Sequence, residues 1–179
     1  MDKLNEKRKI LTKIFAYISL TSGSIWFGAY ISRLLTTYQM FEATELKLKS
    51  YVTDSNISSI FQTTYPLVNL TIFSYLIMIV SFTLFLVFSK IKLKENGWLF
   101  IIAMIIYLTL PFEFILLLID YKLFILFMND QFTSELILQL ITKRVTMLSS
   151  FPIILLFSYL SIPYFLVFQP FTKKTSNEN

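Results

Sequence analysis

Two carboxylic acids, Glu113 and Asp120, lie inside the longest apolar run of the 179-residue sequence, which extends from Trp98 to Met128. They are seven residues apart, close to two turns of an α-helix, so both side chains are expected on one face. Pro111 lies just before Glu113 and removes a backbone donor, which predicts a kink beside that face. A carboxyl group in an apolar segment is costly without a partner, so these two residues are the first candidates for a functional site.

Possible partners for these acids lie elsewhere in the sequence. Arg33 and Arg144 each lie at the edge of an apolar run, at a depth similar to that of Glu113, so all three residues are candidates for a structural ion pair. Two functional alternatives stay open for Glu113, namely a proton or cation relay and a recognition point for another membrane protein. A relay usually needs several titratable groups through the membrane, and the inner halves of the apolar runs contain none.

The composition is that of a membrane protein and removes several kinds of chemistry. Hydrophobic residues make up 55% and aromatic residues 17% of the chain, against 15% charged residues, which is typical of integral membrane proteins. The lack of cysteine and histidine excludes disulfides, thiol nucleophiles and imidazole ligands for metal or haem. The sequence contains no phosphate-binding loop, acidic metal cluster or nucleophile motif, so we expect no enzyme, no cofactor, no metal and no nucleic-acid partner.

Four apolar runs are long enough to cross a bilayer core of about 30 Å as helices. Pro66 is expected to open the second helix, and Pro152 and Pro163 to bend the fourth. An amphipathic helix from 132 to 141 is expected at the membrane surface, while 121–128 either lies there or extends the third helix. The expected fold is an all-α integral membrane protein, a four-transmembrane-helix bundle forming one domain (1–179), with helices at about 14–35, 66–89, 98–119 and 145–171 and external segments at about 36–65 and 120–144.

The distribution of lysine and arginine predicts the orientation of these helices. The two termini and the short turn at 90–95 together carry ten basic and four acidic residues, whereas the residues toward the other side carry six and seven. Because basic residues are retained on the cytoplasmic side, we expect both termini in the cytoplasm.

Three small residues recur at four-residue intervals in the first apolar run, namely Ser24, Gly28 and Ser32. Such a small-residue stripe lets a neighbouring helix approach closely. The favoured interpretation is packing within the chain, and the alternative is contact with the helix of a partner protein.

This architecture, together with three short segments, resembles the immunity proteins of pore-forming bacteriocins, especially those of the colicin A and colicin B type. The segments are the basic N-terminus from Asp2 to Lys9, the NISSI sequence at 56–60 with Pro66 after it, and the PFTKK ending from Pro170 to Lys174. The resemblance implies a protein of the bacterial inner (plasma) membrane that binds the pore-forming domain of its own bacteriocin as that domain inserts, so that the pore does not open.

If the resemblance holds, Ser58 and Ser59 are expected at the contact with the bacteriocin, because they lie in the NISSI segment. The physical arguments add membrane-embedded and outer-face candidates, which are Ser24, Gly28, Ser32, Glu113, Asp120 and Lys122. The alternative function is a small non-catalytic accessory subunit of a larger membrane complex. A third is an oligomeric transporter or channel that uses Glu113; the oligomeric state itself is left open.

Overall fold

The computed structural model describes residues 2–42, 47–53, 55–129, 133–147 and 151–173. Within these ranges the chain forms helices and two isolated β-bridges, with no β-strand. The helices are α1 (Asp2–Gln39), α2 (Ile57–Ser89), α3 (Gly97–Met128), α4 (Ser134–Thr146), α5 (Phe151–Leu160) and α6 (Ile162–Phe168). Four stretches are long and apolar enough to cross a membrane: Leu4–Gln39, Ile57–Ser89, Gly97–Met128 and Phe151–Phe168. The predicted all-helical chain with four such helices is therefore confirmed.

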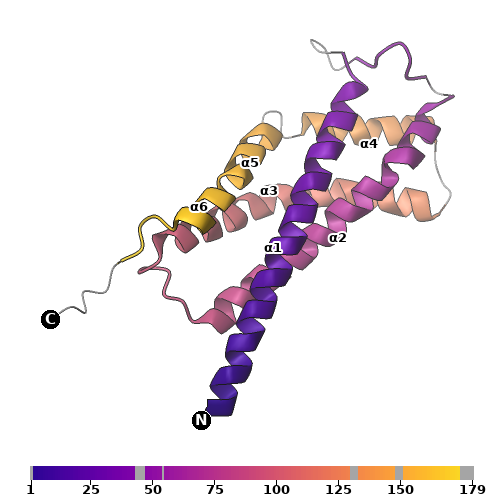
Figure 1. Ribbon diagram of the computed structural model, residues 1–179. Coiled ribbons are helices and arrows are strands. Elements are labelled where there is room, and N and C mark those ends of the chain that lie inside the picture. Colours follow the sequence, from indigo (N-terminus) through magenta and orange to yellow (C-terminus); the bar gives the residue numbers. More distant parts are fainter. Residues whose placement is uncertain (1, 43–46, 54, 130–132, 148–150, 174–179) are drawn as a thin grey trace.

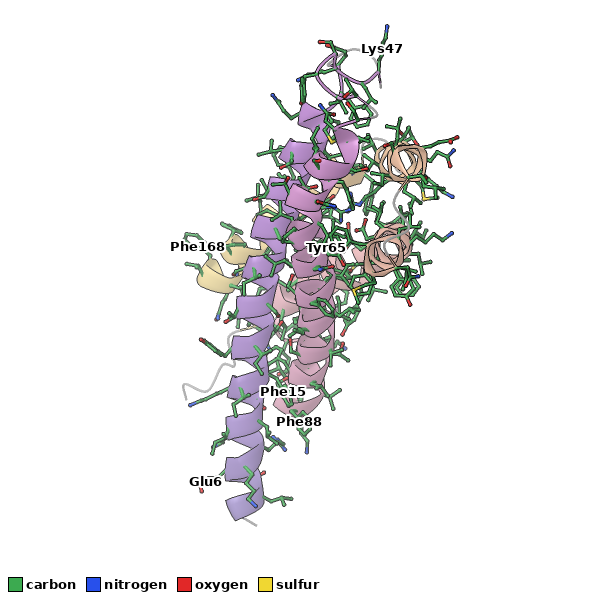
Figure 2. The ribbon with its side chains drawn as sticks, turned by 90° about the vertical axis from the view of Figure 1, so that its right-hand side faces the viewer. Glu6, Phe15, Lys47, Tyr65, Phe88 and Phe168 are labelled. Atoms are coloured by element: carbon green, nitrogen blue, oxygen red, sulfur yellow. The ribbon has the colours of Figure 1, made fainter. Side chains whose placement is uncertain are left out.

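The helices form two layers that cross (Figure 1). In the first layer, α1 and α2 are antiparallel and pack along much of their length, with the rings of Phe15 and Phe88 stacked at a centroid distance of 5.5 Å. In the second layer, α5 and α6 run beside the first half of α3, and α4 runs beside its second half. Figure 2 shows α1 and α2 upright, with α4 and the end of α3 nearly end on, so the second layer crosses the first steeply.

Two predicted helix starts are wrong because both helices begin earlier. The first helix begins at Asp2, not near residue 14, since the basic N-terminal segment contains no helix breaker and continues the same helix. The second begins at Ile57, so Pro66 lies inside it instead of opening it. The hydroxyl groups of Thr63 and Thr64 bond to helix carbonyls one turn earlier, so these polar side chains are satisfied within the helix.

The third helix is longer than predicted and the fourth is divided. Residues 121–128 extend α3, because apolar side chains such as Leu123 continue to pack into the core, and the predicted external segment at 120–144 therefore loses its first third. The expected continuous helix at 145–171 is instead the end of α4 followed by α5 and α6. The chain turns at Ser161 between α5 and α6, just before Pro163, which lacks the N–H that a continuing helix would use.

The predicted amphipathic helix is α4, which begins and ends later than expected. Thr133 caps it by accepting a hydrogen bond from the Leu136 N–H at 3.4 Å, and Ile137 and Ile141 are buried on its apolar face. Phe132, the first residue of the predicted helix, lies outside the described residues.

The segment after α6 is joined to the turn between α2 and α3. The Lys173 N–H bonds to the Glu95 carbonyl at 2.9 Å, and the Gly97 N–H bonds to the Phe171 carbonyl at 3.2 Å. A Cβ atom at Gly97 would lie 2.7 Å from the Cβ atom of Phe171, so glycine is needed for this close approach. The C-terminal segment therefore lies at the same end of the molecule as the basic turn.

The buried side chains form two hydrophobic clusters. The larger contains Trp26 and Tyr30 of α1, Tyr75 of α2, and residues of α3 and α5. The smaller contains Phe61 of α2, Leu123 of α3, and residues of α4 and of the segment after α1. On α2 and α3 the two clusters occupy consecutive stretches, and the buried polar residues Thr71, Ser74 and Asp120 lie between them.

Candidate functional site

One face of α3 carries a stripe of buried polar side chains. Thr109, Glu113 and Asp120 are spaced four and seven residues apart, which places them on a single helix face together with Leu116. All four are buried, and the two carboxylic acids are each only 1% exposed. The predicted common face of Glu113 and Asp120 agrees with this arrangement.

Asp120 is the centre of a buried ionic cluster formed by three helices. Its two carboxylate oxygens each accept a hydrogen bond at 2.5 Å from Arg33 of α1, in a bidentate arrangement. One of them, Oδ1, also accepts a hydrogen bond at 2.8 Å from Nε of Arg144 of α4. The side chains of Arg33 and Arg144 are 8% and 10% exposed. One carboxylate therefore ties α1 and α4 to α3.

Arg144 keeps its charge in this setting. Burial lowers the pKa of its guanidinium group, but the negative charge of Asp120 and the hydrogen bond to it raise the pKa by more, so the net shift is upward. Arg144 thus acts as a fixed positive charge beside the Asp120 carboxylate.

Glu113 does not form the ion pair expected for it. The two arginines pair with Asp120 instead, two turns farther along α3, and no ion pair of Glu113 is formed within the part of the chain that the structure describes. The Glu113 Oε1 atom is buried without a hydrogen-bond partner there. The reason is the position of the arginines along α3. Arg33 of α1 and Arg144 of α4 lie beside Asp120, between the α3 residues of the two hydrophobic clusters, and not beside Glu113.

Aromatic side chains surround the polar stripe near Glu113. The ring of Trp26, which is fully buried, lies 5.4 Å from that of Tyr30, 5.2 Å from that of Tyr75 and 4.6 Å from that of Tyr159, measured between centroids. The hydroxyl groups of Tyr159 and Thr109 are 3.3 Å apart and form a hydrogen bond between α5 and α3. Trp26, Tyr30 and Arg33 are spaced four and three residues apart, a helical period from which their common inward face could have been read.

The small-residue stripe at Ser24, Gly28 and Ser32 is exposed, and Ser24 also lines a cavity between α1 and other helices. A Cβ atom added at Gly28 would meet nothing within 4 Å. Both serine hydroxyls bond to carbonyls of their own helix at 2.9 Å. The favoured expectation that the stripe packs within the chain is therefore wrong.

Other small residues form the close contact inside the molecule. Ser19 and Ser22 are buried on the inward face of α1, and a Cβ atom at Gly23 would lie 3.1 Å from the sulfur of Met78 on α2. The sequence contains both sets, and the aromatic and charged residues that share a face with Ser19 and Ser22 were the signal that could have separated them.

The remaining predicted site residues are scattered. Ser58 and Ser59 lie in the first turn of α2, Ser58 half-buried and Ser59 exposed. Lys122 is exposed on α3. The structure thus brings together Arg33, Asp120 and Arg144. Glu113 is buried apart from this ionic cluster, while Ser24, Gly28, Ser32, Ser59 and Lys122 are exposed and Ser58 is half-buried. Among the described residues no group of three acidic side chains is placed to hold a metal ion.

Comparisons with known proteins give no relative: no protein-family model matches the chain, and neither a curated protein nor a solved structure matches it.

Proposed function

We propose that this chain is a membrane immunity protein that binds the pore-forming domain of a bacteriocin inside the bilayer and keeps the pore from opening. The observation that carries the proposal is the outward position of Ser24, Gly28 and Ser32 on α1. No contact within the described chain uses the open space beside Gly28, so a helix of another protein is free to occupy it.

Packing supplies the physical reason. In a bilayer, association of helices is not driven by the hydrophobic effect, because the lipid tails are as apolar as the side chains. Small residues at four-residue spacing compensate by letting two helix backbones approach closely. A pore-forming domain that inserts hydrophobic helices presents the kind of surface that such a stripe can bind.

A cavity beside the stripe adds room for the side chains of a bound helix. It has a volume of about 210 Å³ and lies between α1, α2, α3 and the α5–α6 segment. Ser24 and Phe27 line it from α1, Met78 from α2, and Leu166 from α6. Because its lining is mostly apolar, this cavity favours a bulky hydrophobic side chain of the inserted domain.

The proposal places the protein in the bacterial inner membrane with both termini in the cytoplasm. The ten basic and four acidic residues at the termini and the α2–α3 turn support this orientation. The hydrogen bonds that join Lys173 to Glu95 and Phe171 to Gly97 support placing the segment after α6 on the same side as that turn. Ser58 and Ser59 would then lie toward the outside, where the bacteriocin arrives.

The test is survival of a sensitive bacterium that expresses this chain and is challenged with a panel of pore-forming bacteriocins, with membrane depolarisation measured as well as growth. We expect protection against one toxin. Gly28→Leu should lower the toxin concentration that kills by about tenfold or more, because about 1.4 kcal/mol of lost helix packing corresponds to a factor of ten in affinity.

Val80→Leu is the matched control, because Val80 is also exposed on a long helix but lies on α2, outside the stripe and far along the helix from Ser58 and Ser59. It should leave protection unchanged. Equal loss of protection in both variants, at equal amounts of protein in the membrane, would contradict the role of the stripe. If no toxin is resisted and a fixed partner copurifies in mild detergent, the chain is an accessory subunit of a membrane complex instead.

A further inference from the structure

A small second pocket lies directly against the ionic cluster. Its volume is about 20 Å³, and it is lined by residues of α1, α2 and α4 that include Arg33, Thr37, Thr64, Val68, Ile141 and Arg144. A space of this size holds one water-sized group. The pocket lies within a turn of the end of α1 at Gln39, so it is near the end of the α1–α2 layer and not at its middle.

The two guanidinium groups have donors left over beside this pocket. Each guanidinium carries five N–H donors. Arg144 gives one hydrogen bond and Arg33 gives two to Asp120, which leaves four and three donors without an acceptor among the described residues. Buried donors without acceptors are costly, so an acceptor is expected in the space that both arginines line.

Charge favours an anion over a water molecule as that acceptor. In the cluster two positive groups contact one carboxylate, and Glu113 forms no ion pair with either arginine. One guanidinium group is therefore left without a carboxylate of its own in direct contact, and Glu113 acts on both arginines only from a distance, in a segment of low dielectric. A neutral water molecule would satisfy a hydrogen bond but not this charge.

Thr37 supplies a neutral donor at the same pocket. Its hydroxyl group forms no hydrogen bond with the described residues, whereas the hydroxyl of Thr64, which also lines the pocket, bonds to carbonyls of its own helix. An anion in the pocket could thus accept bonds from two guanidinium groups and one hydroxyl.

We infer that this pocket binds a single monovalent anion of about the size of chloride, held by Arg33, Arg144 and Thr37. The anion supplies a second negative group in direct contact with the cluster that joins α1, α3 and α4. The inference is independent of the proposed immunity function, because it rests on residues that face inward and not on the stripe of α1.

The test uses the purified full-length protein in dodecyl maltoside, with sodium gluconate replaced stepwise by sodium bromide at constant sodium. Gluconate is too large for the pocket, and bromide is a chloride substitute that can be located by anomalous scattering. A bound anion stabilises the folded state in proportion to ln(1 + [bromide]/Kd). The unfolding temperature should therefore stay flat at low bromide and then rise with its logarithm.

Thr37→Val is the informative variant, because it removes the hydroxyl and leaves both arginine–aspartate pairs in place. Loss of one hydrogen bond to a charged ligand should move the onset of stabilisation to roughly tenfold higher bromide. Thr63→Val is the matched control on α2, and its onset should equal that of the unmodified protein, since Thr63 is exposed and does not line the pocket.

A crystal grown in bromide gives a second readout that does not depend on any variant. An anomalous peak in the pocket beside both guanidinium groups supports the inference. If that peak is present but Thr37→Val has the same onset of stabilisation as the unmodified protein, the anion is held by the two arginines without Thr37. A response that is linear in bromide and equal in all three proteins, or a pocket that holds only water in the bromide crystal, overturns it.

Discussion

Glu113 and Asp120 lie on one face of α3 and are equally buried, yet their direct contacts differ. Asp120 accepts three hydrogen bonds from two guanidinium groups. Glu113 has aromatic neighbours, with Tyr30, Tyr75 and Tyr159 all within electrostatic range, and its Oε1 atom lacks a hydrogen-bond partner in the described structure. The difference shows that the role of a buried carboxyl group depends on which side chains of the neighbouring helices lie beside it.

The largest effect is expected at Asp120. Asp120→Asn removes the negative charge shared by Arg33 and Arg144 and leaves two buried guanidinium groups uncompensated. Breaking a buried ion pair in this way typically costs about 3–5 kcal/mol of the free energy of unfolding. The measurement is reversible unfolding of the purified protein in mixed micelles, by titration of a denaturing detergent.

The control is an ion pair at the surface. Lys92 and Glu95 lie 3.0 Å apart in the α2–α3 turn, and their side chains are 75% and 47% exposed. Lys92→Gln should lower the free energy of unfolding by about 1 kcal/mol or less, because solvent screens such a pair. A loss at Asp120 no larger than the loss at Lys92 would show that the ionic cluster does not hold α1 and α4 to α3.

Glu113→Gln should have a much smaller effect than Asp120→Asn. The substitution keeps the shape of the side chain and removes no ion pair, so we expect the free energy of unfolding to change by less than about 1 kcal/mol in either direction. The same titration measures it. If Glu113→Gln lowers the free energy of unfolding as much as Asp120→Asn, the two carboxyl groups stabilise the protein as one unit and do not differ in role.

The helix period made much of this arrangement predictable. Hydropathy alone gave four helices of membrane-spanning length, and a spacing of seven placed Glu113 and Asp120 on one face. The exact helix limits could not be read in the same way. Residues 57–65 look like a polar loop that ends at Pro66, but threonine hydroxyls that bond to their own helix make that segment compatible with α2.

The pairing of the charges depended on information that no single segment contains. Arg33 and Arg144 were identified as candidate partners of a carboxylate, but Glu113 and Asp120 are only about 10 Å apart along α3, and choosing between them requires the crossing position of α1 and α4. The direction of the Ser24–Gly28–Ser32 stripe posed a different problem. Two sets of small residues lie on α1, and the spacing of four residues alone does not decide which set is inside; the buried aromatic residues on the face of Ser19 and Ser22 do.

The smallest effect is expected where the polar stripe of α3 reaches the aromatic residues around Glu113. The Thr109 hydroxyl gives its proton to the Ile105 carbonyl at 2.8 Å, so in the 3.3 Å contact with Thr109 the Tyr159 hydroxyl is the donor. Tyr159→Phe should lower the free energy of unfolding by about 0.6 kcal/mol, a typical value for a hydrogen bond between helices in a membrane.

The matched control for that prediction is Tyr164→Phe, which removes an exposed hydroxyl from α6 and should change nothing measurable. A double-mutant cycle with Thr109→Val separates the bond from the rings, because the two substitutions should then cost no more together than either does alone. If the losses add instead, Tyr159 stabilises the protein through its ring contact with Trp26. The neighbourhood of Glu113 is then held by packing alone, in contrast to the ionic cluster at Asp120.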